Sequence, residues 1–284
     1  LFPYTTLFRS RQRDHDGRGQ VLKPVLKVEG ATLAFGDLTL WRDLNLEVAP
    51  GEFIAVLGTN GSGKTSLLKA ILGQAKLQSG RILLGGSEIG HGSRKIGYIP
   101  QHRSAGAAPM LAKDLLRLGL SGHRYGLSLH WRENRKRVNH ILDCIEGHDL
   151  ANKPIADLSG GQLQRFRVGQ AVIDEPDLIL ADEPLSALDL AQQRNVADLL
   201  DQERKEHSAA VIFVTHDVNP ILSMVDRVLY FANGQYKIGT PDEVLRSEVL
   251  SELYGTPIDV VRNQGRIVVL GTQTHDHHHE EEWS

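Results

Sequence analysis

The sequence predicts an α/β fold, and two observations lead to it. Short β-rich segments alternate with helical patterns along most of the chain, which is the arrangement of an α/β core. Several of the β-rich segments are continuous apolar runs, namely FIAVL, LILA and VIFV. Runs of this kind are typical of strands that are buried on both faces of a parallel sheet.

The individual elements follow from these patterns in chain order. Strands are predicted at 25–29, 44–48, 52–57, 81–84, 96–99, 178–181, 211–214, 228–231 and 267–270. Helices are predicted at 64–72, 114–118, 132–145, 162–173, 190–205 and 219–224. The stretch 108–157 carries no strong strand signal. We therefore expect a helical insertion between the strands at 96–99 and 178–181.

Composition narrows the possible classes of protein. The 284 residues include 32 Lys and Arg against 35 Asp and Glu, without the basic excess that is usual for a nucleic-acid-binding protein. The one cysteine, Cys144, excludes an internal disulfide and favours a reducing compartment. The apolar run at 209–214 is far shorter than the ~20 residues of a membrane-spanning helix.

Both ends of the chain differ from the regular middle. Residues 1–10, LFPYTTLFRS, match the translation of a common sequencing adapter, so we interpret them as an assembly artefact. Residues 11–22 are predicted to be a disordered leader. The tail 273–284 contains four acidic residues, and without them 32 basic residues face 31 acidic ones. The same tail contains four histidines, His275, His277, His278 and His279. Their imidazole groups suit a transition metal such as zinc; a solvated charged tail and a remnant of an affinity tag are the alternatives.

The strongest local motif is GTNGSGKT at 58–65, between the strand FIAVL and a helical pattern. Glycines let backbone N–H groups point inward around a polyphosphate, and the following helix N-terminus favours anions. Lys64 is expected to reach the β- and γ-phosphates, and the Thr65 hydroxyl to ligate Mg²⁺. The predicted ATP-binding residues here are Gly58, Thr59, Asn60, Gly61, Ser62, Gly63, Lys64, Thr65 and Ser66.

A second motif, LILADE at 178–183, ends an apolar strand on two carboxylates. Ligands bind at this carboxyl edge in open α/β sheets. Asp182 is expected to hold Mg²⁺, directly or through water. Glu183 is expected to polarise an attacking water.

With these motifs and LSGGQ at 158–162, the chain resembles an ATP-binding cassette (ABC) ATPase over about residues 25–255. The resemblance makes Gln101 the Q-loop glutamine that contacts Mg²⁺ and senses the transport partner, and His216 the switch histidine. It places Phe35 where an aromatic ring stacks on adenine, although a core phenylalanine is the alternative. The signature residues are Leu158, Ser159, Gly160, Gly161 and Gln162, and the D-loop residues are Ser186, Ala187, Leu188 and Asp189.

The resemblance implies a P-loop NTPase core at 23–272, with a mixed sheet, an antiparallel β subdomain and an α-helical subdomain at about 105–165. It implies that two copies clamp two ATP molecules head to tail, each signature contacting the partner's nucleotide. Catalysis would fall to Glu183, His216 and Gln101. The chain departs from many relatives at Gly169 and Gln170, which replace an alanine–arginine pair; we expect an effect on helix packing and not on catalysis.

The segment from DVNP at 217–220 to EVLSELYG at 248–255 resembles the ATPase subunits of bacterial zinc and manganese importers. This implies a separate membrane permease, indirectly a solute-binding protein, no nucleic acid, and a peripheral place on the cytoplasmic face of the plasma membrane. Two alternatives stay open: an iron-siderophore or haem importer, and a non-transport ABC protein that acts on ribosomes or DNA. The transported ion is undetermined, because the cassettes of this family do not touch it.

Overall fold

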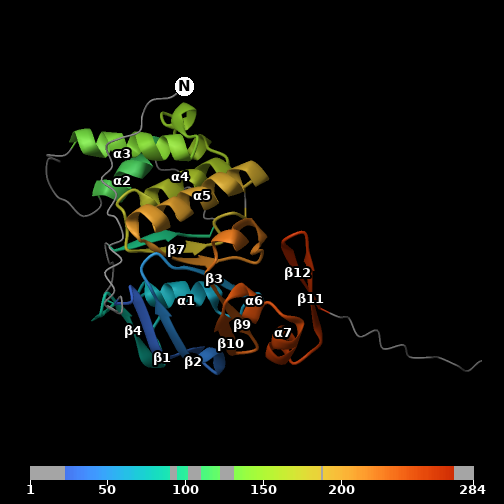
Figure 1. Ribbon diagram of the computed structural model, residues 1–284. Helices are drawn as coiled ribbons and strands as arrows, with labels where there is room; N and C mark the ends of the chain where they lie inside the picture. Colours follow the sequence, from blue (N-terminus) through green and yellow to red (C-terminus); the bar gives the residue numbers. More distant parts are fainter. Residues whose placement is uncertain (1–22, 90–94, 102–109, 122–130, 187, 272–284) are drawn as a thin grey trace, which may run out of the picture.

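The computed structural model describes residues 23–89, 95–101, 110–121, 131–186 and 188–271 (Figure 1). The predicted artefact, the leader, the histidine-rich tail and Ala187 lie outside the described residues. No helix within the described ranges is long and apolar enough to cross a membrane.

A central sheet confirms the parallel core that the apolar runs predict. Its strand order is β10-β9-β3-β8-β7-β6, and every neighbouring pair is parallel except β10 with β9. β7 and β8 are buried at every residue. The strands are β3 (Phe53–Gly58), β6 (Ile96–Ile99), β7 (Leu178–Asp182), β8 (Ala210–Val214), β9 (Arg227–Ala232) and β10 (Gln235–Gly239).

One face of the central sheet packs on helix α1 (Lys64–Ile71) and on a second, antiparallel sheet. Side chains of β3 alternate between the two faces: Ile54 and Val56 belong to this core, whereas Phe53 belongs to the opposite one. The antiparallel sheet has the order β2-β1-β4-β5 and consists of β1 (Leu26–Phe35), β2 (Leu38–Val48), β4 (Ser79–Leu84) and β5 (Ser87–Glu88).

Helices cover the other face and form the upper part of Figure 1. They are α2 (Ala112–Ser121), α3 (Trp131–Cys144), α4 (Gly160–Val172) and α5 (Leu190–His207), with short 3-10 turns η1 (His148–Leu150) and η2 (Ile155–Asp157). Between β6 and β7, the part that the structure describes forms helices and turns, with one isolated β-bridge between Leu111 and Pro154.

Gly169 explains how α4 packs in this layer. A Cβ atom there would lie 2.5 Å from Ile141 Cγ2 and 2.9 Å from Leu116 Cδ2, closer than packed carbon atoms approach. The glycine therefore lets α2 and α3 approach α4. This agrees with the expected effect of the Gly169 departure on helix packing.

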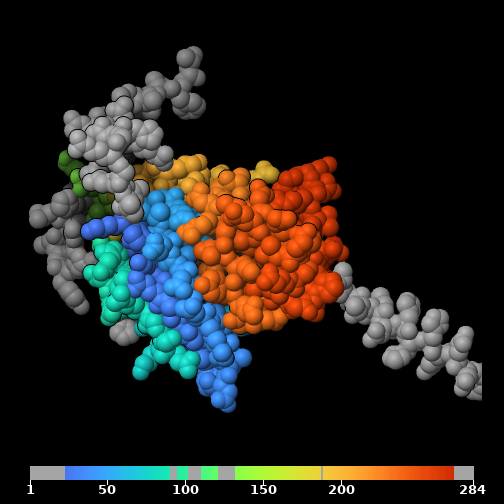
Figure 2. Space-filling model, turned by 60° about the horizontal axis from the view of Figure 1, so that its bottom comes forward, coloured from blue at the N-terminus to red at the C-terminus, as the bar shows by residue number. Residues whose placement is uncertain are grey.

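The C-terminal third adds elements to the edge of the central sheet. Residues 219–224 form a helix at the predicted bounds, the 3-10 helix η3 (Asn219–Met224), with Pro220 at its start. Helices α6 (Pro241–Val244) and α7 (Ser247–Tyr254) lead into a hairpin of β11 (Ile258–Asn263) and β12 (Arg266–Gly271). In Figure 2 these elements, orange to red, gather on one side of the visible face.

Candidate functional site

The glycine-rich loop joins β3 to α1 at the carboxyl edge of the central sheet. Gly58 has φ of 138° and Gly63 has φ of 95°. A Cβ at Gly58 would lie 2.1 Å from the carbonyl oxygen of Phe231, and one at Gly63 would lie 2.9 Å from the Trp41 ring. Both the backbone angles and the close contacts therefore require glycine.

Lys64 begins α1, and its ammonium group is folded back over the loop. Its Nζ donates to the carbonyl oxygens of Gly58 and Thr59, each at 2.8 Å. Burial lowers the pKa of Lys64, while the charges of Glu183 and Asp182 oppose that shift. The structure thus holds a buried amine at the loop, where a polyphosphate would supply a stronger partner than two carbonyls.

Thr65 and Asp182 come from different elements and meet beside Lys64. Thr65 Oγ1 donates to Asp182 Oδ1 at 3.1 Å. Asp182 ends β7 and is almost fully buried, and burial raises its pKa. A hydroxyl beside a carboxylate offers the hard oxygen ligands that Mg²⁺ prefers, and a divalent cation would favour the ionised form of Asp182. These two residues therefore fit a magnesium ion.

Glu183 follows Asp182, and two other predicted residues contact its carboxylate. Its Oε2 atom accepts a hydrogen bond from Gln101 Nε2 at 3.2 Å and lies 3.7 Å from His216 Nδ1. Glu183 has φ of 47°, a left-handed conformation that costs a non-glycine residue about 1–3 kcal/mol. Its backbone N–H donates to Val214 O, and Ser186 Oγ donates to its carbonyl oxygen. The local sequence did not indicate this left-handed conformation.

The signature motif forms the N-terminus of α4. Ser159 is the N-cap residue: its Oγ accepts from Gln162 N, and Gln162 Oε1 accepts from Ser159 N. Ser159 and Gly160 are exposed, Leu158 and Gly161 are half-buried. An exposed N-terminus of a 13-residue helix is suited to an anion from outside the chain.

The D-loop residues fix the start of α5. Asp189 is the N-cap and accepts from Gln192 N at 2.9 Å. Gln193 Nε2 donates to the carbonyl oxygens of Leu185 and Leu188. The side chain of Gln193 therefore holds the backbone of the loop between Glu183 and α5, and the side chain of Asp189 holds the first turn of α5.

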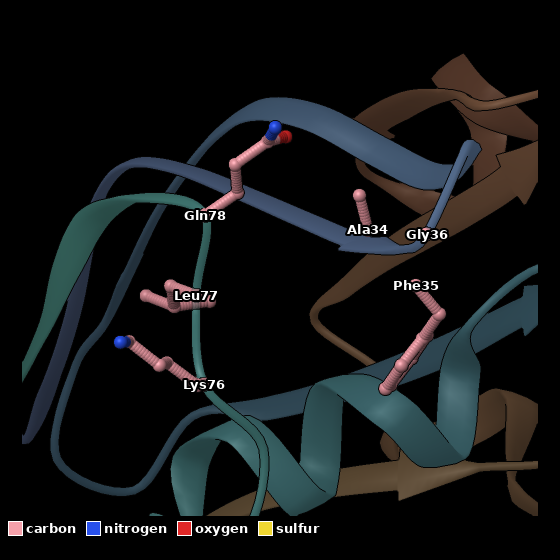
Figure 3. Close-up of a pocket in the computed structure, with 6 residues that line it drawn as sticks. All are labelled: Ala34, Phe35, Gly36, Lys76, Leu77 and Gln78. Carbon is pink, nitrogen blue, oxygen red and sulfur yellow. The ribbon is translucent and has the colours of Figure 1, made fainter.

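Phe35 lies at the turn between β1 and β2, with 56% of its surface exposed. This excludes the alternative of a core phenylalanine. It lines a shallow cavity of about 550 Å³, which segment 76–78 faces from the other side (Figure 3). An exposed aromatic ring over a cavity is available for stacking on a base.

Trp41 and Phe231 are structural parts of the site that sequence reasoning missed. Their rings stack with centroids 6.2 Å apart, and both residues are fully buried. The Trp41 ring lies against Gly63, and the backbone carbonyl group of Phe231 lies against Gly58. No local pattern marks them, because they reach the loop from β2 and β9.

Comparison with known proteins identifies the family of the chain. A family model described as "ABC transporter" matches residues 41–186. A zinc import ATP-binding protein of Halorhodospira halophila is 27% identical, with 92% of each chain covered. One of Roseobacter denitrificans is 31% identical, with 82% of this chain and 85% of that protein covered. A sulfate/thiosulfate import ATP-binding protein of Agrobacterium fabrum is 33% identical, with 77% of this chain and 64% of that protein covered.

Solved structures show the same fold. An inward-facing metal-chelate type ABC transporter matches with a TM-score of 0.72 and 27% identity, covering 88% of this chain and 98% of that one. A dimeric ATP-binding cassette in a post-hydrolysis state, bound to ADP and Pi, matches with a TM-score of 0.65 and 28% identity, covering 76% and 98%.

Proposed function

This chain belongs to the ABC transporter family, and from that premise we propose that it is the ATP-hydrolysing subunit of a bacterial importer for zinc or manganese. ATP hydrolysis coupled to transport is the activity of the family. The observation that carries the ATP-hydrolysing role is that Gln101 and His216 both face the Oε2 atom of Glu183, near the buried Lys64 and Asp182.

The residues divide the chemistry between them. Lys64 and the loop N–H groups bind the β- and γ-phosphates. Thr65 and Asp182, with the Gln101 amide oxygen, would hold Mg²⁺, which would supply positive charge beside the phosphates. Glu183 orients the attacking water and accepts its proton. His216 contacts the γ-phosphate, and Phe35 stacks on the adenine.

We further propose that two copies of the chain act together, head to tail. The phosphates of one nucleotide would be surrounded by the chain's own residues 58–65, so the exposed N-terminus of α4 would serve the nucleotide of the second copy. ATP then favours the closed dimer, and hydrolysis releases it. The dimeric cassette bound to ADP and Pi supports a dimer of two such chains.

The other proposed partners are a membrane permease and, through it, a solute-binding protein; nucleic acid is not among them. The helical subdomain at about 105–165 of the ATPase domain at 23–272 is the proposed contact with the permease. It would place the protein on the cytoplasmic face of the bacterial plasma membrane. The histidines of the tail would bind cytoplasmic zinc and adjust ATPase activity.

Zinc is supported by the names of relatives from several bacteria. Sulfate importers of similar identity and a metal-chelate type transporter give two competing substrates. The test is transport by the complex reconstituted with the permease from the neighbouring reading frame. Zinc, manganese, a ferric siderophore and sulfate are compared in that assay. Stimulated uptake of zinc or manganese alone supports the proposal, whereas stimulated uptake of sulfate or siderophore alone overturns it.

A further inference from the structure

Hydrogen bonds of Thr215 hold the turn that carries His216. Thr215 Oγ1 donates to Asp217 O at 2.8 Å and accepts from Asp217 N at 3.1 Å. Thr215 N donates to Val56 O of β3. The His216 side chain itself is 65% exposed. Because little packing surrounds the imidazole, its position depends on the backbone on either side of it.

Asn219 links this turn to a distant segment of the chain. Asp217 Oδ1 accepts hydrogen bonds from Asn219 N at 2.9 Å and from Asn219 Nδ2 at 2.7 Å. Asn219 Nδ2 also donates to Ile267 O at 2.9 Å, and Asn219 Oδ1 accepts from Ile267 N at 2.8 Å. One amide side chain therefore joins the turn after His216 to strand β12, which lies 48 residues further on.

The hairpin that receives Asn219 is itself anchored. Ile258 and Ile267 are buried in the same core as Ile221. Arg262 Nη1 donates to Asp242 Oδ1 at 2.7 Å, and Val260 N donates to Ser247 Oγ at 2.9 Å. These contacts hold the β11–β12 hairpin on α6 and α7. Asn219 therefore connects the turn after His216 to a hairpin that is itself anchored.

We propose that Asn219 is a positioning residue for ATP hydrolysis. Its hydrogen bonds to Asp217 and Ile267, called the clamp below, hold His216 against Glu183. The proposal rests on the proposed role of His216 in hydrolysis. Displacing a catalytic group by about 1 Å costs on the order of 100-fold in rate. Loss of the clamp therefore lowers kcat and leaves ATP affinity, which residues 58–65 supply, unchanged.

The first experiment measures kcat, KM for ATP and nucleotide affinity for Asn219→Ala and Asn219→Asp. We expect Asn219→Ala to lower kcat about 10-fold at unchanged KM. Asn219→Asp should lower kcat further, because its carboxylate faces Asp217. Adding Asp217→Asn to Asn219→Asp removes the repulsion between the two carboxylates and should raise kcat in part, because the carboxylate at 219 still cannot donate to Ile267 O. Asn263→Ala, an exposed position on the same hairpin, is the control. Unchanged kcat in Asn219→Ala overturns the proposal.

A second pair of variants separates the hydrogen bond from packing. Ile267→Ala removes buried side-chain atoms but keeps the N–H group, whereas Ile267→Pro removes both. A lower kcat for Ile267→Pro than for Ile267→Ala, at equal ATP affinity, supports the clamp; equal kcat values overturn it. His216→Ala separates the role of His216 in hydrolysis from the role of Asn219 in positioning it. An inactive His216→Ala beside a normal Asn219→Ala refutes only the clamp, and an active His216→Ala refutes the role of His216 as well.

Discussion

Gln101 and Glu183 are joined by a hydrogen bond in which Gln101 Nε2 donates to Glu183 Oε2 at 3.2 Å, across 82 residues of sequence. Gln101 follows β6, and Glu183 follows the neighbouring parallel strand β7. The same carboxylate oxygen faces His216, which follows β8. Three loops at one edge of the sheet therefore share a single carboxylate, and movement of any of them changes the surroundings of the proposed base.

Glu183→Gln should slow ATP hydrolysis by at least about 100-fold, because the amide cannot accept the proton of the attacking water. ATP binding should persist, so the variant should accumulate as an ATP-bound dimer. Phosphate release and size-exclusion chromatography with ATP measure the two effects. Glu248→Gln, an exposed position on α7, is the control. Normal turnover of Glu183→Gln would exclude Glu183 as the base.

Lys64→Ala should abolish or severely weaken ATP binding, because it removes the buried cation at the phosphate loop. Calorimetric titration with ATP measures the affinity. Lys69→Ala, on the exposed side of α1, should bind ATP normally. An unchanged affinity in Lys64→Ala would contradict the assignment of the loop.

Ser159→Arg should block closure of the dimer while each monomer still binds ATP, because the long side chain fills the anion site at the start of α4. Ser159→Ala is the matched variant: it loses the same cap, worth about 1 kcal/mol, without the bulk. Dimer formation with ATP in the Glu183→Gln background, measured by light scattering, should fail for arginine and persist at least in part for alanine. A stable ATP-bound dimer of the arginine variant would be evidence against the proposed interface.

Leu118→Glu should weaken binding to the permease, because Leu118 is an exposed apolar side chain on α2, within the segment proposed to meet the membrane partner. ATPase activity of the isolated subunit should not change. Val268→Glu, on the exposed part of β12, is the control. Co-purification with the neighbouring permease measures the effect; equal recovery of both variants would move the contact elsewhere.

Glu203→Gln should stabilise the protein above neutral pH. Burial, with smaller contributions from Glu175 and Glu206, raises the pKa of Glu203 to about 7 from its ordinary value of 4.5. Below pH 4.5 the carboxyl is neutral in both the folded and unfolded states. As the pH rises to 7 and above, the folded state must hold a buried charge, which costs about 3 kcal/mol at the upper end.

The melting temperature of the wild type should therefore fall relative to Glu203→Gln between pH 5 and pH 8, as measured by thermal unfolding. Glu248→Gln should follow the wild type over the same range. Parallel curves for Glu203→Gln and the wild type would show that Glu203 ionises normally.

The α/β class, the parallel core and the order of the motifs along the chain follow from the sequence alone. The reason is that the apolar runs of β7 and β8 and the loop at 58–65 are local patterns, readable within a few residues. Strand β10 was missed, because its half-buried edge position leaves no continuous apolar run. Helices α6 and α7 are too short for a clear period.

The contacts between the motifs, in contrast, depend on the tertiary structure. The Thr65–Asp182 hydrogen bond spans 117 residues, and the clamp between Asn219 and Ile267 spans 48. The left-handed backbone of Glu183 and the contacts of Gly58 and Gly63 with Phe231 and Trp41 likewise depend on neighbours from other strands. Local patterns select which segments become strands and helices, whereas the distances between side chains are set by sheet register and packing, which bring distant segments together.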